Sequence, residues 1–448
     1  MLRYVPRLLK LAGPLVLSFS TVALMQVVDA LVLSRHSSEA VAAMGPSSMA
    51  VIVFQALLFG TAGYAGIFVA HSYGRGDFHG VRSSAWLGIH TAAVSGMLAL
   101  ALAWPLAQIF GLVGHSPQVA DDEMVYFSIC MAGSFFPVLG AALSGWLAGI
   151  GRTLTITWVT FVSFALNVVL TWVLVLGAWG FPRMGMAGAA LGTVISQMVA
   201  AILFVALFAR NEGFADAEAR RLQWREFRRF LLMALPMGLR ISGEVVAWTV
   251  FLVIVGRLGT VELAASSIAF RINGLAFFPA LGLGQAAGIL IGHARGAGND
   301  DEVPIITWQS LFVCEIWMLA MAVLFVTVPE PLMTIFAGTG PDSGQIVESG
   351  VLVLKFVAVY CLFDAANVMI SYVLSATGDT GWIARAFALC TAVFMAVLWL
   401  VDQTMPSLTA EWILATGFVF ATAALWMFRF QSGEWRRIKV LRAEEPRP

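Results

Sequence analysis

Three carboxylates lie within long apolar stretches of this sequence: Asp29, Glu244 and Asp364. None of these side chains is long enough to reach the edge of a membrane from the interior of a span. A charge at mid-bilayer costs about 3 kcal/mol on insertion scales, so each group should face protein, water or a partner. A carboxylate held there is either protonated or bound to a cation. The chemistry predicted from these residues is reversible binding of protons or small cations.

Four further charged residues fall within the apolar stretches: Arg240, Arg271, Glu315 and Lys355. The last three lie near the ends of their stretches, where a long side chain or a local partner can satisfy the charge, and we interpret them as structural. Arg240 precedes Glu244 by four residues and can pair with it on one helix face. If the two pair, Glu244 stays ionised and its role in capturing an ion is in doubt. If Arg240 points away, Glu244 is an open site.

The elements that position these residues are membrane spans. The chain has 448 residues, of which 60% are hydrophobic and 12% are charged, which is more apolar surface than a water-soluble domain can bury. Stretches of about 20 apolar residues, each long enough to cross a bilayer as a helix, recur throughout. The first stretch is too long for a removable signal peptide and should remain as a span. We predict twelve spans: 9–34, 43–70, 84–112, 123–149, 156–178, 186–209, 230–257, 263–292, 304–328, 347–375, 382–402 and 409–430.

The distribution of basic residues predicts the orientation of these spans. With the N-terminus in the cytoplasm, most Lys and Arg residues between spans fall on the cytoplasmic side, and only Arg35, Arg183 and Arg257 fall on the other. This is the positive-inside pattern, and it favours an even number of spans with both termini in the cytoplasm. The net charge of zero therefore conceals a polarised molecule, and no feature indicates a nucleic-acid partner. The expected location is a bacterial-type inner membrane.

The two halves of the sequence are related to each other. A shift of 222 residues places Pro14 on Pro236 and "GIFVAHSYGRG" (66–76) on "GILIGHARGAG" (288–298). Six spans in each half give both halves the same orientation, so the repeat is parallel. We predict an all-α polytopic membrane protein of two six-helix bundles around a central cavity. The predicted domains are an N-terminal bundle at 1–209, a cytoplasmic linker at 210–229, a C-terminal bundle at 230–430 and a basic cytoplasmic tail at 431–448.

Such a duplication is typical of alternating-access transporters, although channels and membrane enzymes can also be duplicated. An enzyme should show a nucleophile, a metal cluster or a cofactor motif, and the sequence contains neither G-x-S-x-G nor H-E-x-x-H. We therefore expect a transporter that is not an enzyme and needs no cofactor beyond its coupling ion. Pro14, Pro137, Pro236 and Pro279 lie within predicted spans and can bend them.

Three segments carry a resemblance to a known family. They are "QVVDALVLSRHSSEAVAAMG" (26–45), the segment 140–196 that begins "GAALSGWLAGIGRT", and "LFDAANVMISYVLSATGDT" (362–380). The sequence resembles the multidrug and toxic compound extrusion (MATE) transporters across essentially all twelve spans, and within them the NorM-like branch. The resemblance implies cation-coupled antiport that exports amphipathic, cationic small molecules by alternating access. The alternative is a lipid-linked precursor flippase of the same superfold, which should line its cavity with more basic residues than this chain has.

The resemblance also implies two sets of cation-binding residues. In the second half, Glu244 and Asp364 match acidic residues of the family's spans seven and ten, and Tyr360 matches a tyrosine of the cation site. Tyr360 and Asp364 are four residues apart, which places both on one helix face. Arg240, four residues before Glu244, is not expected in the family and is a possible modulator of this set.

In the first half, Asp29, Asn167 and Thr193 match family positions in spans one, five and six. Thr171, where relatives often have Asn or Asp, departs from the pattern and is a possible modulator. These residues offer hard oxygen ligands with one negative charge, which suits a proton or a monovalent cation. The implied coupling ion is H⁺ or Na⁺, with Na⁺ held by Asp364, Tyr360 and Glu244 or by Asp29 and Asn167. The expected partners are a small-molecule substrate and the lipid bilayer, with a monomer as the default state.

Overall fold

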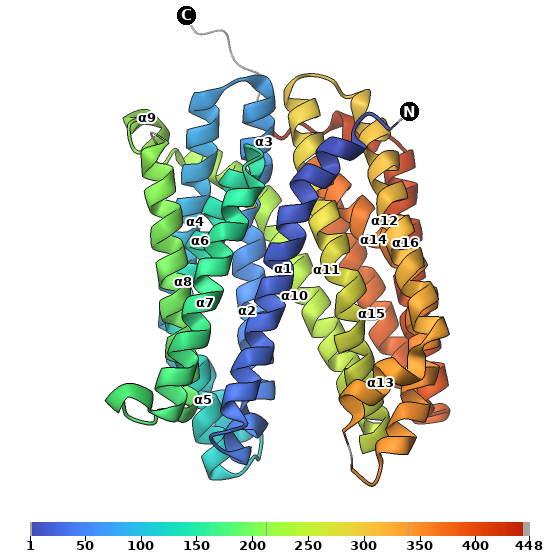
Figure 1. Ribbon diagram of the computed structural model, residues 1–448. Coiled ribbons are helices and arrows are strands. Elements are labelled where there is room, and N and C mark those ends of the chain that lie inside the picture. Colours follow the sequence, from blue (N-terminus) through green and yellow to red (C-terminus); the bar gives the residue numbers. More distant parts are fainter. Residues whose placement is uncertain (1, 212, 339, 442–448) are drawn as a thin grey trace, which may run out of the picture. The chain divides into compact units, whose positions relative to one another are not determined.

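The computed structural model describes residues 2–211, 213–338 and 340–441, and the regular structure within these residues is entirely helical (Figure 1). Eleven helical segments of the described chain are long and apolar enough to span a membrane. They are α1 (Val5–Leu33), α2 (Ser38–Gly63) continued by α3 (Ala65–Arg75), α4 (Phe78–Ala107), α7 (Thr153–Leu176), α8 (Gly185–Arg210), α10 (Trp224–Leu258), α11 (Thr260–Gly296), α12 (Glu302–Thr327), α14 (Ser343–Ala376), α15 (Thr380–Thr404) and α16 (Leu408–Gln431).

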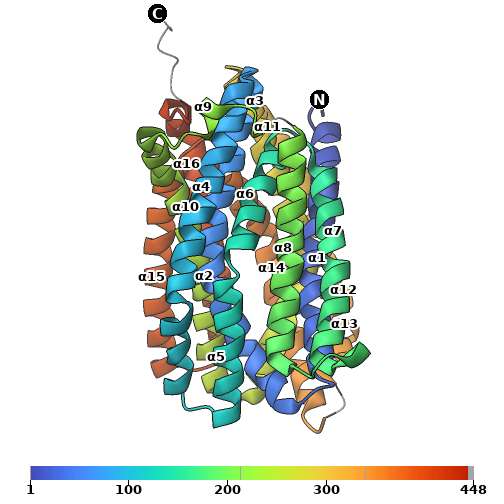
Figure 2. The same cartoon turned by 90° about the vertical axis from the view of Figure 1, so that its left-hand side faces the viewer.

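A twelfth span is broken into α5 (Pro117–Ala132) and α6 (Phe135–Gly149), which are bent by 45°. Figure 2 shows the two as successive segments of one path through the N-terminal half. Pro137 explains the position of the break, because proline has no amide to donate to the carbonyl of Gly133 four residues earlier, and its ring crowds that carbonyl. The twelve predicted spans are therefore confirmed when the bent pair is counted as one span, and the bend lies beside Pro137, one of the prolines expected to bend their spans. Pro14, Pro236 and Pro279 lie inside α1, α10 and α11.

The chain divides into two compact units. The N-terminal unit comprises Leu17–Ser242 with Gly296–Gly298, and the C-terminal unit comprises the residues up to Val16, Gly243–Arg295 and the residues from Asn299 onward. The boundaries cut through α1 and α10 rather than falling in the linker. The first turns of α1 therefore belong to the C-terminal unit. Just before this helix, the Tyr4 amide donates to Gln309 of α12 at 2.9 Å, and Arg3 lies 3.6 Å from Glu302.

Small residues hold the helices of the N-terminal unit close together. Helix α3 packs against α6 where Gly66 meets Gly145, and a Cβ atom added at Gly66 would lie 2.7 Å from the Gly145 carbonyl oxygen. A Cβ atom added at Gly149, one turn later, would lie 2.7 Å from the Gly66 carbonyl oxygen. In lipid, where water cannot drive helices together, such close backbone contact is a main source of association. These contacts fix the scaffold that carries α7 and α8.

The linker predicted at 210–229 packs against the N-terminal unit over part of its length. Gly213 accepts a hydrogen bond from the Trp86 indole at 3.0 Å, and Asp216 caps the short helix α9 (Ala217–Arg220) by accepting from the Ala219 amide at 2.9 Å. This amide hydrogen bond, together with His79 at 2.6 Å, lowers the pKa of Asp216. Because the pKa of Asp216 is lowered in the folded chain, its hydrogen bonds stabilise the linker fully at pH values above the ordinary pKa of an aspartate. This stabilisation is lost as the pH falls through the lowered pKa.

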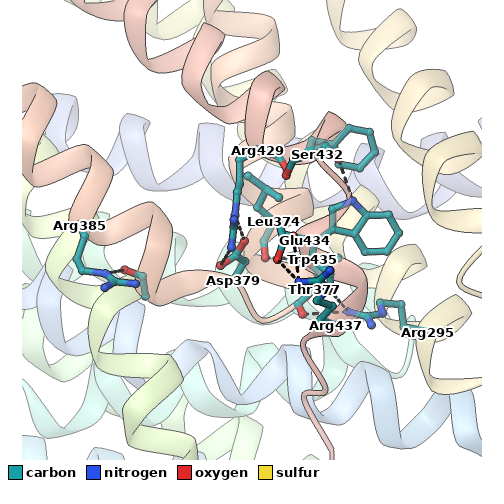
Figure 3. Close-up of polar contacts among 12 residues, drawn as sticks. Arg295, Leu374, Thr377, Asp379, Arg385, Arg429, Ser432, Glu434, Trp435 and Arg437 are labelled. Carbon is teal, nitrogen blue, oxygen red and sulfur yellow. Dashed lines mark hydrogen bonds and ion pairs between the residues drawn. The ribbon is translucent and has the colours of Figure 1, made fainter.

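The described part of the predicted tail folds back onto the C-terminal unit (Figure 3). After α16 the chain forms a 3-10 helix, η3 (Glu434–Arg437), whose Trp435 is only 1% exposed. Arg295, at the end of α11, donates to the carbonyl oxygens of Thr377 at 3.0 Å and Trp435 at 3.3 Å, and its guanidinium lies 5.5 Å from the Trp435 ring centroid. Arg429 donates to Asp379 at 2.7 Å beside it. Residues 442–448 of the predicted tail lie outside the described residues.

Trp435 should therefore be a stability determinant of the C-terminal unit. We expect Trp435→Ala to lower the free energy of unfolding by about 3–5 kcal/mol, because it removes a fully enclosed indole that stacks on Phe430. Thermal melting in detergent measures the effect. Trp399→Ala, at a 59% exposed tryptophan of α15, is the matched control and should cost much less. Equal melting temperatures for the two variants would contradict a structural role for this segment.

Candidate cation sites

Asp29 lies in the second half of α1, within the N-terminal unit, and is 5% exposed. Two hydroxyl groups from neighbouring helices donate to its two carboxylate oxygens. Thr171 of α7 donates to Oδ1 at 2.8 Å, and Thr193 of α8 donates to Oδ2 at 3.4 Å. The structure thus brings together Asp29, Thr171 and Thr193, which are separated by up to 164 residues in sequence.

The close approach of α7 and α8 depends on a glycine between them. A Cβ atom added at Gly192 would lie 3.1 Å from both the amide nitrogen and the hydroxyl oxygen of Thr171. Since Gly192 has no side chain, α8 can lie near enough to α7 for Thr193 of the next position to reach the same carboxylate. The two helices pack along much of their length in the N-terminal unit (Figure 1).

Asn167 completes this cluster one turn before Thr171. Its Nδ2 donates to the Thr193 hydroxyl at 3.3 Å, and the residue is fully buried. Its Oδ1 accepts no hydrogen bond among the described residues. A buried amide oxygen without a donor is an open ligand position, since leaving such an acceptor unsatisfied costs about 1–3 kcal/mol. The four residues therefore provide one carboxylate, two hydroxyls and one open carbonyl oxygen. Thr171, a possible modulator in the sequence analysis, donates the shorter of the two hydroxyl hydrogen bonds to Asp29.

Asp364 is the predicted site carboxyl of the C-terminal unit. It lies in the middle of α14 and is 7% exposed, and Tyr360, one turn earlier on the same helix, is 2% exposed. Glu244 of α10 is half-buried and lies within electrostatic range of the Asp364 carboxyl. The predicted residues Asp364, Tyr360 and Glu244 thus all belong to the C-terminal unit.

A residue that sequence reasoning missed contacts Asp364 directly. Asn367 Nδ2 donates to Asp364 Oδ1 at 3.0 Å, and Asn367 Oδ1 accepts from the indole of Trp426 on α16 at 2.7 Å. This relay ties the carboxylate to a fully buried tryptophan of a neighbouring helix. The signal in the sequence was the i, i+3 spacing of an amide after the aspartate in "FDAANVM", which places both on one face of a helix.

Arg240 and Glu244 lie in the same helix but are counted with different units, Arg240 with the N-terminal one and Glu244 with the C-terminal one. Their mutual pairing, left open above, therefore stays a prediction. Of the other charges within spans, Arg271 and Lys355 are exposed and Glu315 is half-buried. None of the described His, Cys, Asp and Glu residues forms a group of three or more that could hold a metal ion. The two clusters offer few charges and several neutral oxygens, a donor set suited to a proton or a monovalent cation.

Known proteins with similar sequences and folds identify the family of this chain. A protein-family model described as MatE matches residues 14–173 and 236–401, well over half of the chain. The chain belongs to the MatE family. The two matched segments of this MatE chain start 222 residues apart, as the internal repeat does, and the resemblance inferred from sequence is confirmed. The protein is accordingly a membrane transporter and not an enzyme.

Individual relatives agree with this assignment over nearly full length. The MatE chain is 27% identical to "Probable multidrug resistance protein NorM" of Thermotoga maritima over 444 residues, which cover 98% of this chain and 94% of the relative. It is also 27% identical to the protein of the same name in Agrobacterium fabrum, covering 89% and 84%. A solved structure described as the "Outward-facing conformation of a multidrug resistance MATE family transporter of the MOP superfamily" matches with a TM-score of 0.86 at 19% identity, over 96% of each chain. The predicted all-α fold is thereby confirmed.

Asn367 should act as a positioning residue for Asp364. We expect Asn367→Leu to lower stability by about 1–3 kcal/mol, because it leaves the Trp426 indole without its acceptor and Asp364 without its amide donor. The same variant should change the pH dependence of transport, since the carboxyl loses the hydrogen bond that favours its charged form. Melting curves and pH profiles of dye export measure the two effects.

Asn273→Leu is the control for this variant, because Asn273 belongs to the same unit and its contact with Cys361 is a weak one at 3.7 Å. A transport pH profile that is identical for wild type and Asn367→Leu would contradict the positioning role.

Proposed function

We propose that this MatE-family protein is a cation-coupled antiporter that uses H⁺ or Na⁺ to export amphipathic, cationic small molecules by alternating access. The observation that carries the proposal is the Asp29 cluster. Its carboxylate receives hydroxyl hydrogen bonds at 2.8 and 3.4 Å inside a membrane span, and the Asn167 carbonyl oxygen beside it accepts none. Such a site can bind and release a small cation without covalent chemistry.

The proposed coupling is competition for carboxylates. An ionised Asp29 or Asp364 attracts an organic cation, and the same group bound to H⁺ or Na⁺ no longer does. When Asp29 takes up a proton, the new O–H needs an acceptor, and the Asn167 carbonyl oxygen, which accepts no hydrogen bond among the described residues, is the candidate for it. One charge that moves through 100 mV supplies about 2.3 kcal/mol. That free energy supports a roughly fifty-fold concentration gradient per charge.

The substrate class is supported by charge and by the names of relatives. Both named relatives above are called multidrug resistance proteins. Shared fold alone would not decide the substrate, since a Pyrococcus furiosus structure with a TM-score of 0.85 and 19% identity is described as "Reverse polarity of binding pocket suggests different function of a MOP superfamily transporter". In this chain the charged side chains of both clusters are carboxylates, which favours cations. The basic loops of the sequence support an inner-membrane orientation with both termini in the cytoplasm.

Removal of the Asp364 charge should abolish coupled export. We expect Asp364→Asn to insert and fold, because the side-chain volume is unchanged, but to export a cationic dye at least tenfold more slowly. The measurement is dye movement in proteoliposomes of the full chain, with Na⁺ and pH gradients imposed separately. Glu348→Gln, at an exposed acidic residue of α14, is the control. Near-normal export by Asp364→Asn would contradict the proposal that Asp364 couples ion binding to export.

Asp29→Asn should behave as a permanently neutral Asp29. We expect this variant to bind dye weakly and to fail to complete the cycle, because its charge can no longer change. Export at the wild-type rate, with unchanged dependence on external pH and Na⁺, would show that the Asp29 cluster only holds its helices together. The coupling would then rest on Asp364 and Glu244.

The pairing of Arg240 with Glu244 can be decided by a double-mutant cycle. If the two residues pair, Glu244→Gln should destabilise the protein by about 3–5 kcal/mol, and the added change Arg240→Gln should restore much of that loss. Melting temperatures of the two single variants and the double variant, with matched dye uptake, measure the coupling. A stable Glu244→Gln that has lost transport would instead identify a carboxylate that is open to ions or substrate.

A further inference from the structure

Glu411 is a buried carboxyl group that neither cation cluster uses. It lies one turn into α16 of the C-terminal unit and is 0% exposed. Both of its carboxyl oxygens are enclosed, and neither has a hydrogen-bond partner among the described residues. Capping of the helix end does not account for it, because Ser407 already caps α16 by accepting from the Ala410 amide at 3.2 Å. A group of this kind requires a separate explanation.

The surroundings of Glu411 disfavour a negative charge. Asp402, at the end of the preceding helix α15, lies within electrostatic range of Glu411, and its side chain is 4% exposed. Asp402 is itself the acceptor for Arg257 at 2.9 Å and for the Gln403 amide at 2.8 Å. Arg257 is thus paired with Asp402 and not with Glu411. The indole of Trp412, the next residue after Glu411, donates to Ser266 at 3.1 Å.

The remaining titratable groups near this end of the C-terminal unit do not neutralise Glu411 by any described contact. Besides Arg257 on α10 and Asp402 on α15, they include Glu262 in the first turn of α11, Glu330 in the first turn of α13, Asp342 before α14, and Glu348 and Lys355 on α14. Glu262 lies against Gly259, and Glu348 and Lys355 are exposed. Helices α14 and α15 both pack against α16.

We propose that Glu411 is a proton-binding site of the C-terminal unit, and that the Arg257–Asp402 ion pair controls exchange of its proton. A carboxyl group without donors and next to a second carboxylate is stabilised as the neutral acid, since no cation or hydrogen bond compensates its charge. Arg257, whose side chain is 55% exposed, joins Asp402 to the solvent-accessible surface of the unit. When the pair opens, Arg257 becomes available to Glu411, and Glu411 can release its proton.

This site is distinct from Asp364 and does not depend on the proposed antiport. Asp364 has an amide donor from Asn367, whereas Glu411 has none among the described residues. Glu411 would bind its proton while the Arg257–Asp402 pair is closed and release it when the pair opens. This would hold even if the coupling ion of Asp29 and Asp364 were Na⁺. The test therefore reads the proton directly rather than through transport.

Infrared spectroscopy of the full chain in lipid vesicles at neutral pH detects the proton. A protonated carboxyl has a C=O stretch separate from the amide and carboxylate bands. We expect the wild-type spectrum minus that of Glu411→Gln to contain this band, because glutamine lacks the acid but keeps its shape. The exposed control Glu348→Gln should leave the band unchanged. A difference spectrum that contains only carboxylate bands would overturn the proposal.

A second pair of variants tests the control by Arg257 and does not require that Glu411→Gln folds. In Asp402→Asn, Arg257 loses its carboxylate partner and should pair with Glu411, so the protonated band should disappear at neutral pH. In the double variant Asp402→Asn with Arg257→Gln, no cation is available and the band should return. If the band persists unchanged in Asp402→Asn, the ion pair does not control the proton, and that part of the proposal is wrong.

Discussion

The constraint on which the structure depends is the cost of a carboxylate inside a membrane-spanning helix. Asp29 cannot satisfy both of its oxygens from its own helix, so two other helices must bring donors to it. Thr171 and Thr193 do so, and they meet only because Gly192 lets α8 lie against α7. The position of α7 and α8 in the N-terminal unit is thus tied to the charge state of a residue on α1. Any change in that charge alters the balance of hydrogen bonds that holds three helices together.

The two halves of the repeat satisfy their carboxylates in different ways. Asp29 receives hydroxyl donors from two neighbouring helices, whereas Asp364 receives an amide from its own helix, and that amide is held in turn by an indole on α16. A hydroxyl can rotate and act as donor or acceptor, while an amide held by a tryptophan has a fixed orientation. The Asp29 cluster can therefore rearrange its hydrogen bonds when it takes up a cation. The Asp364 relay is better suited to keep one geometry.

Much of the fold follows from the sequence because hydrophobicity alone marks membrane spans. The twelve spans, the 222-residue repeat and the family all agree with the structure and the comparisons. Pro137 was expected to bend span four, but the size of the bend could not be predicted, because proline within a span indicates a bend without fixing its angle. Thr171 was grouped with Asp29 from the sequence, but its hydrogen bond to the carboxylate could not be predicted, because the family pattern marks positions and not which hydroxyl donates.

Asn367 and Glu411 show a second limit of sequence reasoning. Both are polar residues with ordinary neighbours in sequence, and their importance depends on which distant group lies beside them. Trp426 is 59 residues from Asn367, and Glu411 is fully enclosed although it lies only one turn into α16. A rule that searches the middle of spans for charges finds Asp364 but passes over an amide one turn later. It also passes over an acid one turn from a helix end, where water normally solvates it.

The C-terminal unit has unlike ends, and this difference bears on where it can move. At one end Arg295 contacts the backbone oxygens of Thr377, Trp435 and Arg436, so that α11, the α14–α15 turn and η3 are joined through one buried side chain. At the other end the Arg257–Asp402 pair joins α10 to α15 through an arginine that is half in solvent. A buried arginine with several acceptors is costly to withdraw, whereas Arg257 is 55% exposed and can exchange its carboxylate partner for water. Opening of helices α10 and α15 should therefore begin at the end that holds the Arg257–Asp402 pair.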